Sequence, residues 1–115
     1  MPYFAIQTNQ PLDDTAKADL LKSASAFIAE LLGKSEAYVM VALDAGVPLS
    51  FGASRNPAAY VALRSIGLPT ERCSEFAAKI SHFLEATLQI SKERVFIDFA
   101  NLHRDRFAWN GKTFA

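Results

Sequence analysis

The feature that most constrains this chain is an internal repeat with a spacing of 56 residues. Hydrophobic positions in the first half recur at this spacing in the second half. The matched pairs are Phe4 and Tyr60, Leu20 and Phe76, Ala24 and Ile80, Phe27 and Phe83, Ile28 and Leu84, Leu32 and Leu88, Val39 and Val95, and Val41 and Ile97. Self-similarity at a fixed spacing indicates a duplicated supersecondary unit. The chain should therefore contain two copies of one unit.

The first copy reads as a β-α-β unit. Phe4 and Ile6 alternate with other side chains, as in a half-buried strand, and residues 13–32 carry apolar side chains at helical spacing. Gly33 suits the left-handed residue that ends many helices. Residues 38–43 are continuously apolar, which is typical of a short buried strand.

The second copy repeats this order. It predicts a strand over 58–66, a helix that has Thr70 as its N-cap and ends near Leu88, and a strand over 95–100. The copies span about 2–44 and 58–100. Residues 101–115 form an extension whose segment 107–114 reads as a short hairpin.

These elements predict an α/β (α+β) fold. Two pseudo-repeated β-α-β units form a four-stranded mixed sheet with two helices on one face, plus the C-terminal hairpin. At 115 residues the chain should be a single domain, residues 1–115. Strands 38–43 and 58–63 read as apolar on both sides, so the face without helices should pack against further copies in a homo-oligomer.

Composition excludes several classes of function. Twelve Lys and Arg balance twelve Asp and Glu, so the chain lacks the broad basic surface that binds nucleic acids or anionic membranes. Cys73 is the only cysteine, which leaves no internal disulfide or cysteine-rich zinc site. No metal-binding motif contains His82 or His103, and we expect neither a metal nor a cofactor. The sequence has neither a signal-peptide pattern nor an apolar run that could insert into a membrane.

Pro2 is the candidate catalytic residue. Removal of Met1 would turn its nitrogen from a tertiary amide into a secondary amine that can accept a proton. An α-amine has a pKa of roughly 7.7 to 8.0, and partial burial lowers this pKa towards the optimum of a general base at neutral pH. Taken alone, however, a second-position proline signals only N-terminal processing.

Several short segments give this proline a context. They are Met1-Pro2-Tyr3-Phe4, Thr8-Asn9, Gly33-Lys34, Ser65-Ile66-Gly67, Ile90-Ser91, Arg94-Val95, Trp109-Asn110 and Thr113-Phe114-Ala115. In these segments the chain resembles the macrophage migration inhibitory factor (MIF) family of the tautomerase superfamily, over essentially its whole length. The resemblance implies a homotrimer that tautomerises phenylpyruvate-like and dopachrome-like substrates, small aromatic keto acids among them, without a cofactor. It also implies a cytoplasmic protein or one secreted without a signal peptide, and kinship alone suggests receptor binding.

The resemblance also assigns roles. Pro2 is implied as the proton-shuttling base, Lys34 as the group that binds the substrate carboxylate or carbonyl oxygen, and Ile66 as a backbone contributor. The implied aromatic walls are Tyr38, Trp109 and Phe114. Each of these residues also has a structural interpretation: Lys34 favourably meets the dipole of the preceding helix, and the aromatic residues fill a core or an interface.

The sequence departs from the family pattern at three places. Ala58-Ala59-Tyr60-Val61 replaces a Cys-x-x-Cys, so no thiol oxidoreductase activity is expected. Phe96 and Asp98 replace a Tyr and an Asn that the family places in the pocket from the neighbouring subunit. An ionised Asp98 would raise the pKa of the Pro2 amine and repel a substrate carboxylate, unless Arg64 or Arg106 neutralises it.

The residues therefore leave three functions open. The first is a cofactor-independent tautomerase with Pro2 as its base. The second is a MIF-like cytokine or binding protein whose tautomerase pocket is weak or idle, an interpretation that Phe96 and Asp98 favour. The third is a purely structural oligomer.

Overall fold

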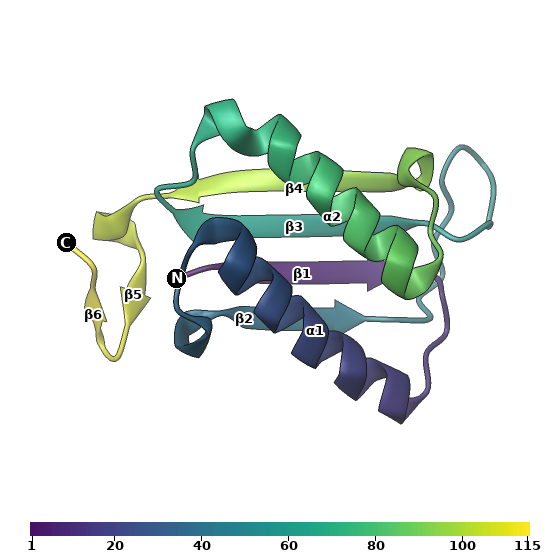
Figure 1. Ribbon diagram of the computed structural model, residues 1–115, viewed down its shortest axis with the longest axis horizontal. Helices are drawn as coiled ribbons and strands as arrows, with labels where there is room; N and C mark the ends of the chain where they lie inside the picture. Colours follow the sequence, from purple (N-terminus) through teal and green to yellow (C-terminus); the bar gives the residue numbers. More distant parts are fainter.

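The computed structural model describes residues 1–115 as a four-stranded mixed sheet with two helices on one face (Figure 1). The strands lie in the order β2-β1-β3-β4. Within each copy the two strands are parallel, and the copies meet where β1 and β3 pair antiparallel. The elements are β1 (Tyr3–Thr8), α1 (Asp14–Leu32), β2 (Met40–Asp44), β3 (Ala59–Ile66), α2 (Cys73–Leu88) and β4 (Val95–Leu102). The predicted fold class is confirmed.

The two helices begin differently. Helix α1 is capped by Asp13, whose Oδ1 accepts a hydrogen bond from the Ala16 backbone N at 2.8 Å. Thr70, by contrast, opens a 3-10 turn, η2 (Thr70–Arg72), and α2 follows at Cys73 without a side-chain cap. The prediction that Thr70 caps the second helix is therefore wrong, because the extra turn separates it from the first helical residue.

Both helices end in the left-handed conformation. Gly33 has a φ of 64° after α1, as its position predicts, and Gln89 has a φ of 55° after α2. After each cap comes a 3-10 turn, η1 (Glu36–Tyr38) in the first copy and η3 (Lys92–Arg94) in the second. The strand expected over 38–43 consequently begins only at Met40, because Tyr38 closes the turn.

The repeat is offset by one residue in its first strand. Phe4 is buried beneath the helices, whereas Tyr60 is 45% exposed on the other face. Val61 is the buried residue that pairs with Ile6. Since side chains alternate between the faces of a strand, Phe4 corresponds to Val61, and the predicted match with Tyr60 is wrong.

The hydrophobic core lies between the helices and the sheet. Its largest fully buried side chains come from both copies and include Phe4, Ile6, Ile28, Val61, Leu63, Phe76, Ile80, Leu84 and Ile90. Between the helices, the rings of Phe27 and Phe83 stack with centroids 4.4 Å apart. These two residues are a matched pair of the repeat, so the symmetry extends to the packing of α1 on α2.

The opposite face of the sheet carries no helix. Exposed aromatic and aliphatic side chains lie there, such as Met40 and Phe96, which are 65% and 60% exposed. Polar groups are interspersed with them: Gln7 donates a hydrogen bond to Asp44 at 3.4 Å, and Tyr60 donates one to Asp98 at 3.1 Å. Residues 40–43 and 59–63 nevertheless carry apolar side chains on both faces, as predicted, and the face itself has no helix over it.

The C-terminal extension folds back beside the start of β1 (Figure 1). A 3-10 turn, η4 (Arg104–Arg106), leads into the hairpin of β5 (Ala108–Trp109) and β6 (Lys112–Thr113). Asn110 and Gly111 both have positive φ, as a tight two-residue hairpin turn requires. No helix in the structure is both long enough and apolar enough to span a bilayer.

Candidate active site

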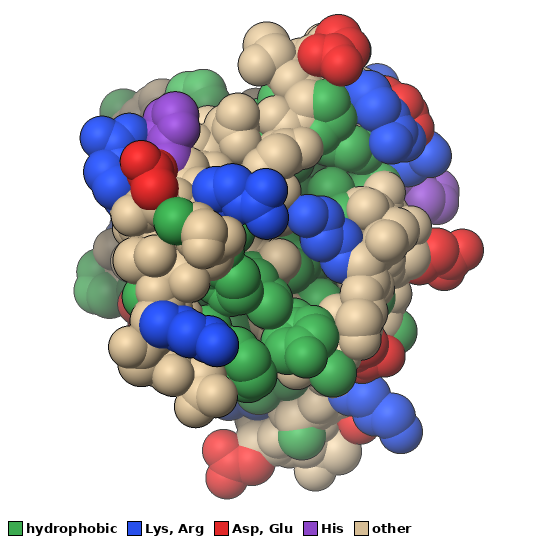
Figure 2. Space-filling model, turned by 90° about the vertical axis from the view of Figure 1, so that its left-hand side faces the viewer, with side chains coloured by type: hydrophobic (Ala, Val, Ile, Leu, Met, Phe, Trp, Pro, Cys, Tyr) green, Lys and Arg blue, Asp and Glu red, His purple; other side chains and the backbone are tan.

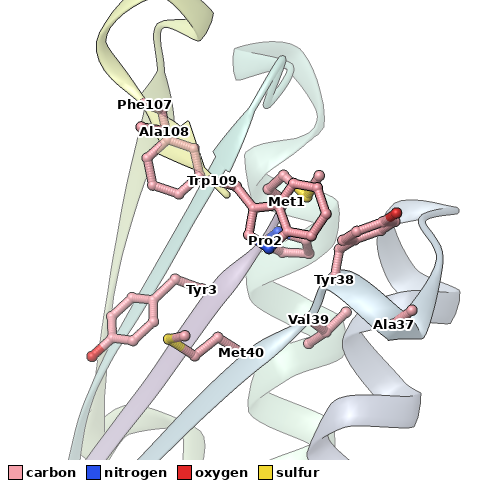
Figure 3. Close-up of a pocket in the computed structure, with 10 residues that line it drawn as sticks. All are labelled: Met1, Pro2, Tyr3, Ala37, Tyr38, Val39, Met40, Phe107, Ala108 and Trp109. Atoms are coloured by element: carbon pink, nitrogen blue, oxygen red, sulfur yellow. The ribbon is translucent and has the colours of Figure 1, made fainter. Parts of the chain in front are cut away.

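An apolar pocket lies at the end of the sheet where β1 begins. Its volume is about 390 Å³, and its walls come from the N-terminus, the η1–β2 segment and the C-terminal hairpin (Figure 3). Figure 2 shows apolar side chains gathered in a recess at this end of the molecule, with basic side chains beside them. The lining residues are Met1, Pro2, Tyr3, Ala37, Tyr38, Val39, Met40, Phe107, Ala108 and Trp109.

Pro2 lies at the base of this pocket. Its side chain is fully buried, and its carbonyl oxygen accepts a hydrogen bond from the Met40 backbone N at 3.0 Å. That bond extends the β1–β2 pairing to the first residues of the chain, so the position of the proline ring is fixed by the sheet. Pro2 is thus held where a bound molecule would meet it.

The environment at this end of the chain weakens the basicity of an amine. Burial lowers the pKa of the Met1 α-amine below its usual value, because desolvation disfavours the charged form, and the positive charge of Lys34 lowers the pKa further. Lys34 is therefore close enough to the N-terminus to act on it electrostatically.

Lys34 joins the two copies of the repeat. Its backbone N bonds to the Ala29 carbonyl across the end of α1, and its Nζ donates to the Ile66 carbonyl oxygen at 3.0 Å. Two of the residues predicted for the site, Lys34 and Ile66, are therefore in direct contact. Neither lines the wall of the apolar pocket itself, so the ammonium group lies beside the pocket.

Tyr38 and Trp109 form an aromatic pair in the pocket wall. Their rings meet edge to face with centroids 5.5 Å apart, and both remain about half exposed. Phe114 lies behind this wall, where it stacks on Phe107 at 5.9 Å. Phe107 and Met40 line the pocket although no sequence feature singled them out. The signal that could have identified Phe107 is its spacing of two residues from Trp109 on the same arm of the hairpin, because side chains at this spacing point to the same side of a strand.

Phe96 and Asp98 lie far from this pocket within one chain. Phe96 pairs with Tyr60, which pairs with Gln7 near the end of β1, at the opposite end of the strand from Pro2. Asp98 accepts a hydrogen bond from the Tyr60 hydroxyl, and this bond raises the pKa of Tyr60. Neither Arg64 nor Arg106 forms an ion pair with Asp98, since both salt bridges of the chain involve Glu75.

The remaining candidate groups do not assemble. No cluster of three or more His, Cys, Asp or Glu side chains is arranged to hold a metal ion. Cys73 is a free thiol at the start of α2, and His82 and His103 are exposed.

Comparison with known proteins identifies the family. The family model described as macrophage migration inhibitory factor (MIF) matches residues 1–115. The chain belongs to the MIF family. Among its relatives, the MIF homologue of Trichinella spiralis is 40% identical over 99% of this chain and 100% of its own length. The Brugia malayi homologue is 38% identical over 99% of both chains.

Solved structures give the same result for the fold. The MIF of Trichinella spiralis superposes with a TM-score of 0.89 at 39% identity, covering 97% of this chain and 99% of the other. The MIF homologue of Prochlorococcus marinus has the same TM-score at 37% identity, covering 98% and 99%. The MIF-family match and the tautomerase fold are thus confirmed over the segments that build the pocket.

Proposed function

We propose that this protein is a cofactor-independent keto–enol tautomerase of phenylpyruvate-like and dopachrome-like substrates, with Pro2 as its general base once Met1 is removed. The observation that carries the proposal is the position of Pro2 at the base of an apolar pocket, with the ammonium group of Lys34 close enough to act on the N-terminus. Burial and Lys34 together lower the pKa of the Met1 α-amine, and an amine on Pro2 would lie at the same end of the chain, at the base of the same apolar pocket. A substantial neutral fraction at physiological pH is what a general base requires.

The proposed reaction is a proton transfer between carbon and oxygen. The neutral Pro2 nitrogen takes the α-proton of the keto form, and the C–H electron pair becomes the carbon–carbon double bond of the enolate. The carbonyl oxygen receives the negative charge and then a proton from the protonated Pro2 nitrogen, so the product is an isomer of the substrate and the amine is neutral again. Conversion of the enol to the keto form uses the same two transfers in the opposite order.

Lys34 is suited to stabilise the enolate oxygen. An ammonium group has three N–H donors, and the Ile66 carbonyl uses one of them. The remaining donors are free for a substrate oxygen, and the contact with Ile66 keeps the side chain from moving into solvent. A fixed cation beside the place where negative charge develops lowers the barrier, because it need not reorganise during the reaction.

The apolar walls favour an aromatic substrate. Tyr38, Trp109, Phe107 and Met40 offer ring faces and a flexible thioether to a phenyl group. Such walls also exclude water from the nitrogen of Pro2, which keeps its pKa low.

We further propose a homotrimer assembled through the face of the sheet that has no helices. Phe96 and Asp98 lie on this face, far from their own Pro2, and can reach only the pocket of another copy. Sedimentation equilibrium at dilute concentration should give the mass of three chains, and a stable monomer would contradict this part of the proposal.

A binding protein with a weak or idle tautomerase pocket is the second candidate. The observation that favours it is Asp98, whose only hydrogen-bonding partner is a neutral hydroxyl and which forms no ion pair. An anion near the pocket would favour the charged form of Pro2 and oppose substrate carboxylates. Absence of turnover on correctly processed trimer, together with specific receptor binding, would support this second function.

The test of the leading proposal is the pH dependence of phenylpyruvate tautomerisation, measured on protein whose intact mass confirms that Met1 is absent. The rate should rise with pH through one ionisation that lies below the pKa of an ordinary α-amine, because only the neutral amine accepts a proton. Protein that retains Met1 is the control and should be inactive, since its Pro2 nitrogen is an amide. A rate that rises only above the range of ordinary α-amines would exclude Pro2 as the base.

A further inference from the structure

Two side chains hold the segment between β2 and β3, residues 45–58. Asn9 donates hydrogen bonds to the carbonyl oxygens of Leu49, Arg55 and Asn56 and accepts one from the Ala58 backbone N, whereas Arg94 holds the turn that carries Phe51. The guanidinium group of Arg94 donates hydrogen bonds to the carbonyl oxygens of Phe51 at 3.0 Å, Ser54 at 3.2 Å, Asn56 at 3.0 Å and Pro57 at 3.1 Å. Arginine has five N–H donors in a rigid planar fork, which lets a single side chain serve four carbonyls. A lysine has the charge but lacks this geometry.

The same guanidinium group begins a chain of stacked groups. It lies over the ring of Phe51, 5.2 Å from the ring centroid. The Phe51 ring in turn stacks on Phe96, with centroids 4.7 Å apart and planes inclined by 21°. Phe96 has no other aromatic partner and is 60% exposed, so this stack is the contact that restricts its ring.

The turn that carries Phe51 is itself tightly constrained. Gly52 and Ala53 have φ values of 58° and 62°, and the backbones of Phe51 and Ser54 exchange hydrogen bonds of 2.9 and 3.1 Å. A left-handed alanine is unfavourable and persists only where its surroundings over-determine it. Arg94 supplies that constraint, because it binds a carbonyl at each end of the turn. The segment therefore presents Phe51 in one fixed position.

We propose that Arg94 and Phe51 are positioning residues for substrate binding, which hold Phe96 in the orientation that closes the pocket of the neighbouring copy. This inference rests on the proposed tautomerase and its homotrimer. Neither Arg94 nor Phe51 touches the substrate in this arrangement; both act through Phe96. An exposed ring without the stack populates several rotamers, and a ligand that packs on it must then select one of them at a cost in affinity.

The expected effect is on binding and not on the chemical step. Phe96 contacts the substrate ring equally in the ground state and the transition state, so loss of its ordering should raise KM and leave kcat nearly unchanged. We expect Phe51→Leu to raise KM for phenylpyruvate by about threefold to tenfold, the range of one immobilised side chain. Phe51→Leu retains the hydrogen bonds of Arg94, because these involve backbone carbonyls.

Two further variants separate positioning from general damage. Phe51→Tyr keeps the stack and should restore KM to within about twofold of the original value. Arg72, in the turn before α2, also lies over an aromatic ring, that of the core residue Phe76 at 4.8 Å, but this pair is on the helical side of the sheet, away from Phe96. Arg72→Met is therefore the matched control, and its KM should not change. An equal rise in KM for this control and for Phe51→Leu would overturn the proposal.

The experiment also distinguishes this inference from the proposed function. The Kd of 3-phenylpropionate, which has the ring and carboxylate but no keto group, can be followed by Trp109 fluorescence without any turnover. It should rise in Phe51→Leu by the same factor as KM. If the wild-type trimer binds 3-phenylpropionate but turns over no phenylpyruvate, the tautomerase proposal fails while the Kd comparison still tests the positioning role. Unchanged Kd in trimeric Phe51→Leu would overturn that role.

Discussion

The two copies of the repeat have nearly the same backbone but end in opposite ways. Each has a left-handed helix cap, a serine, a 3-10 turn and a parallel strand in the same order. The first copy ends in an open apolar pocket, and the second ends in a tightly bonded loop. The side chains at three corresponding positions differ: Pro2, Lys34 and Tyr38 in the first copy stand against Ala59, Ile90 and Arg94 in the second.

This difference shows that the same backbone arrangement can end in a pocket or in a bonded loop, depending on a few side chains. Ile90 is fully buried in the core, whereas Lys34, at the corresponding position of the first copy, donates a hydrogen bond from its ammonium group to the Ile66 carbonyl oxygen. Arg94 binds the loop that precedes β3, where Tyr38 instead leaves its ring at the mouth of a pocket. The repeat provides two equivalent scaffolds, and the side chains form an apolar pocket at the end of only one of them.

Among the changes that test the difference between the two copies, removal of the secondary amine of Pro2 should have the largest effect. Pro2→Gly, processed to begin at residue 2, leaves a primary amine on a flexible residue in place of the rigid ring. We expect kcat/KM for phenylpyruvate to fall by about 10² to 10⁴, the usual contribution of a positioned general base. Steady-state kinetics on mass-verified trimer make the measurement, and turnover like that of the wild type would exclude the Pro2 mechanism.

Lys34→Ile gives the first copy the residue that the second copy has at the corresponding position, Ile90. Loss of the cation should lower kcat/KM by about 10² to 10³, comparable with the loss of one donor to a developing oxyanion. It should also move the ionisation of the Pro2 amine to higher pH, because Lys34 lowers the pKa of an amine at this end. The interaction with the helix dipole is worth only about 0.3 to 1 kcal/mol, so the melting temperature should change little. A large loss of stability with little loss of activity would favour the structural interpretation of Lys34.

Asp98→Asn tests the neighbouring copy's contribution and should have a smaller effect of opposite sign. Removal of a negative charge lowers the pKa of the Pro2 amine and relieves repulsion of the substrate carboxylate. We expect kcat/KM for phenylpyruvate to rise by about threefold to tenfold, where a factor of ten corresponds to about 1.4 kcal/mol. The ionisation of the Pro2 amine should also move to lower pH. Phe96→Tyr restores the hydroxyl that the family pattern has at position 96, and it should change KM for phenylpyruvate. Unchanged kinetics and pH profiles in both variants would show that these residues lie outside the pocket.

The starts of the two helices give the smallest predicted difference. Asp13→Ala removes a side-chain cap and should lower the free energy of unfolding by about 1 kcal/mol. Thr70→Ala should lower it by less than about 0.5 kcal/mol, because Thr70 makes no capping bond. Urea unfolding of both variants makes the comparison, and equal losses would restore Thr70 as a cap.

The repeat made most of the fold predictable. Helical periodicity placed α1 and α2, because each helix buries one apolar face against the sheet. It could not place the start of β2, since Tyr38 and Val39 continue the apolar run without a turn signal. It also could not detect the one-residue offset at Val61, because Tyr60 and Val61 are both hydrophobic and only the register decides which of them faces the helices.

Part of the pocket lining could be named from the sequence through the family resemblance. Pro2, Tyr38 and Trp109, which are far apart in the chain, line one pocket, and their roles there stay predictions. Met40 and Phe107 were missed because their place depends on how β2 and the hairpin pack around the N-terminus. The partner of Asp98 was equally hidden, since Tyr60 reaches it diagonally across two strands whose register no local pattern specifies.

The bond from Lys34 to Ile66 has a consequence for how activity depends on temperature. The positive charge belongs to one half of the molecule and is aligned by a carbonyl of the other half. Slippage between the halves would misalign the charge while both helices stay formed, since local opening needs less free energy than global unfolding. We therefore expect heating to reduce the proposed activity at temperatures below the melting temperature. The temperature at which activity is lost would then report on the stability of the contact between the two halves.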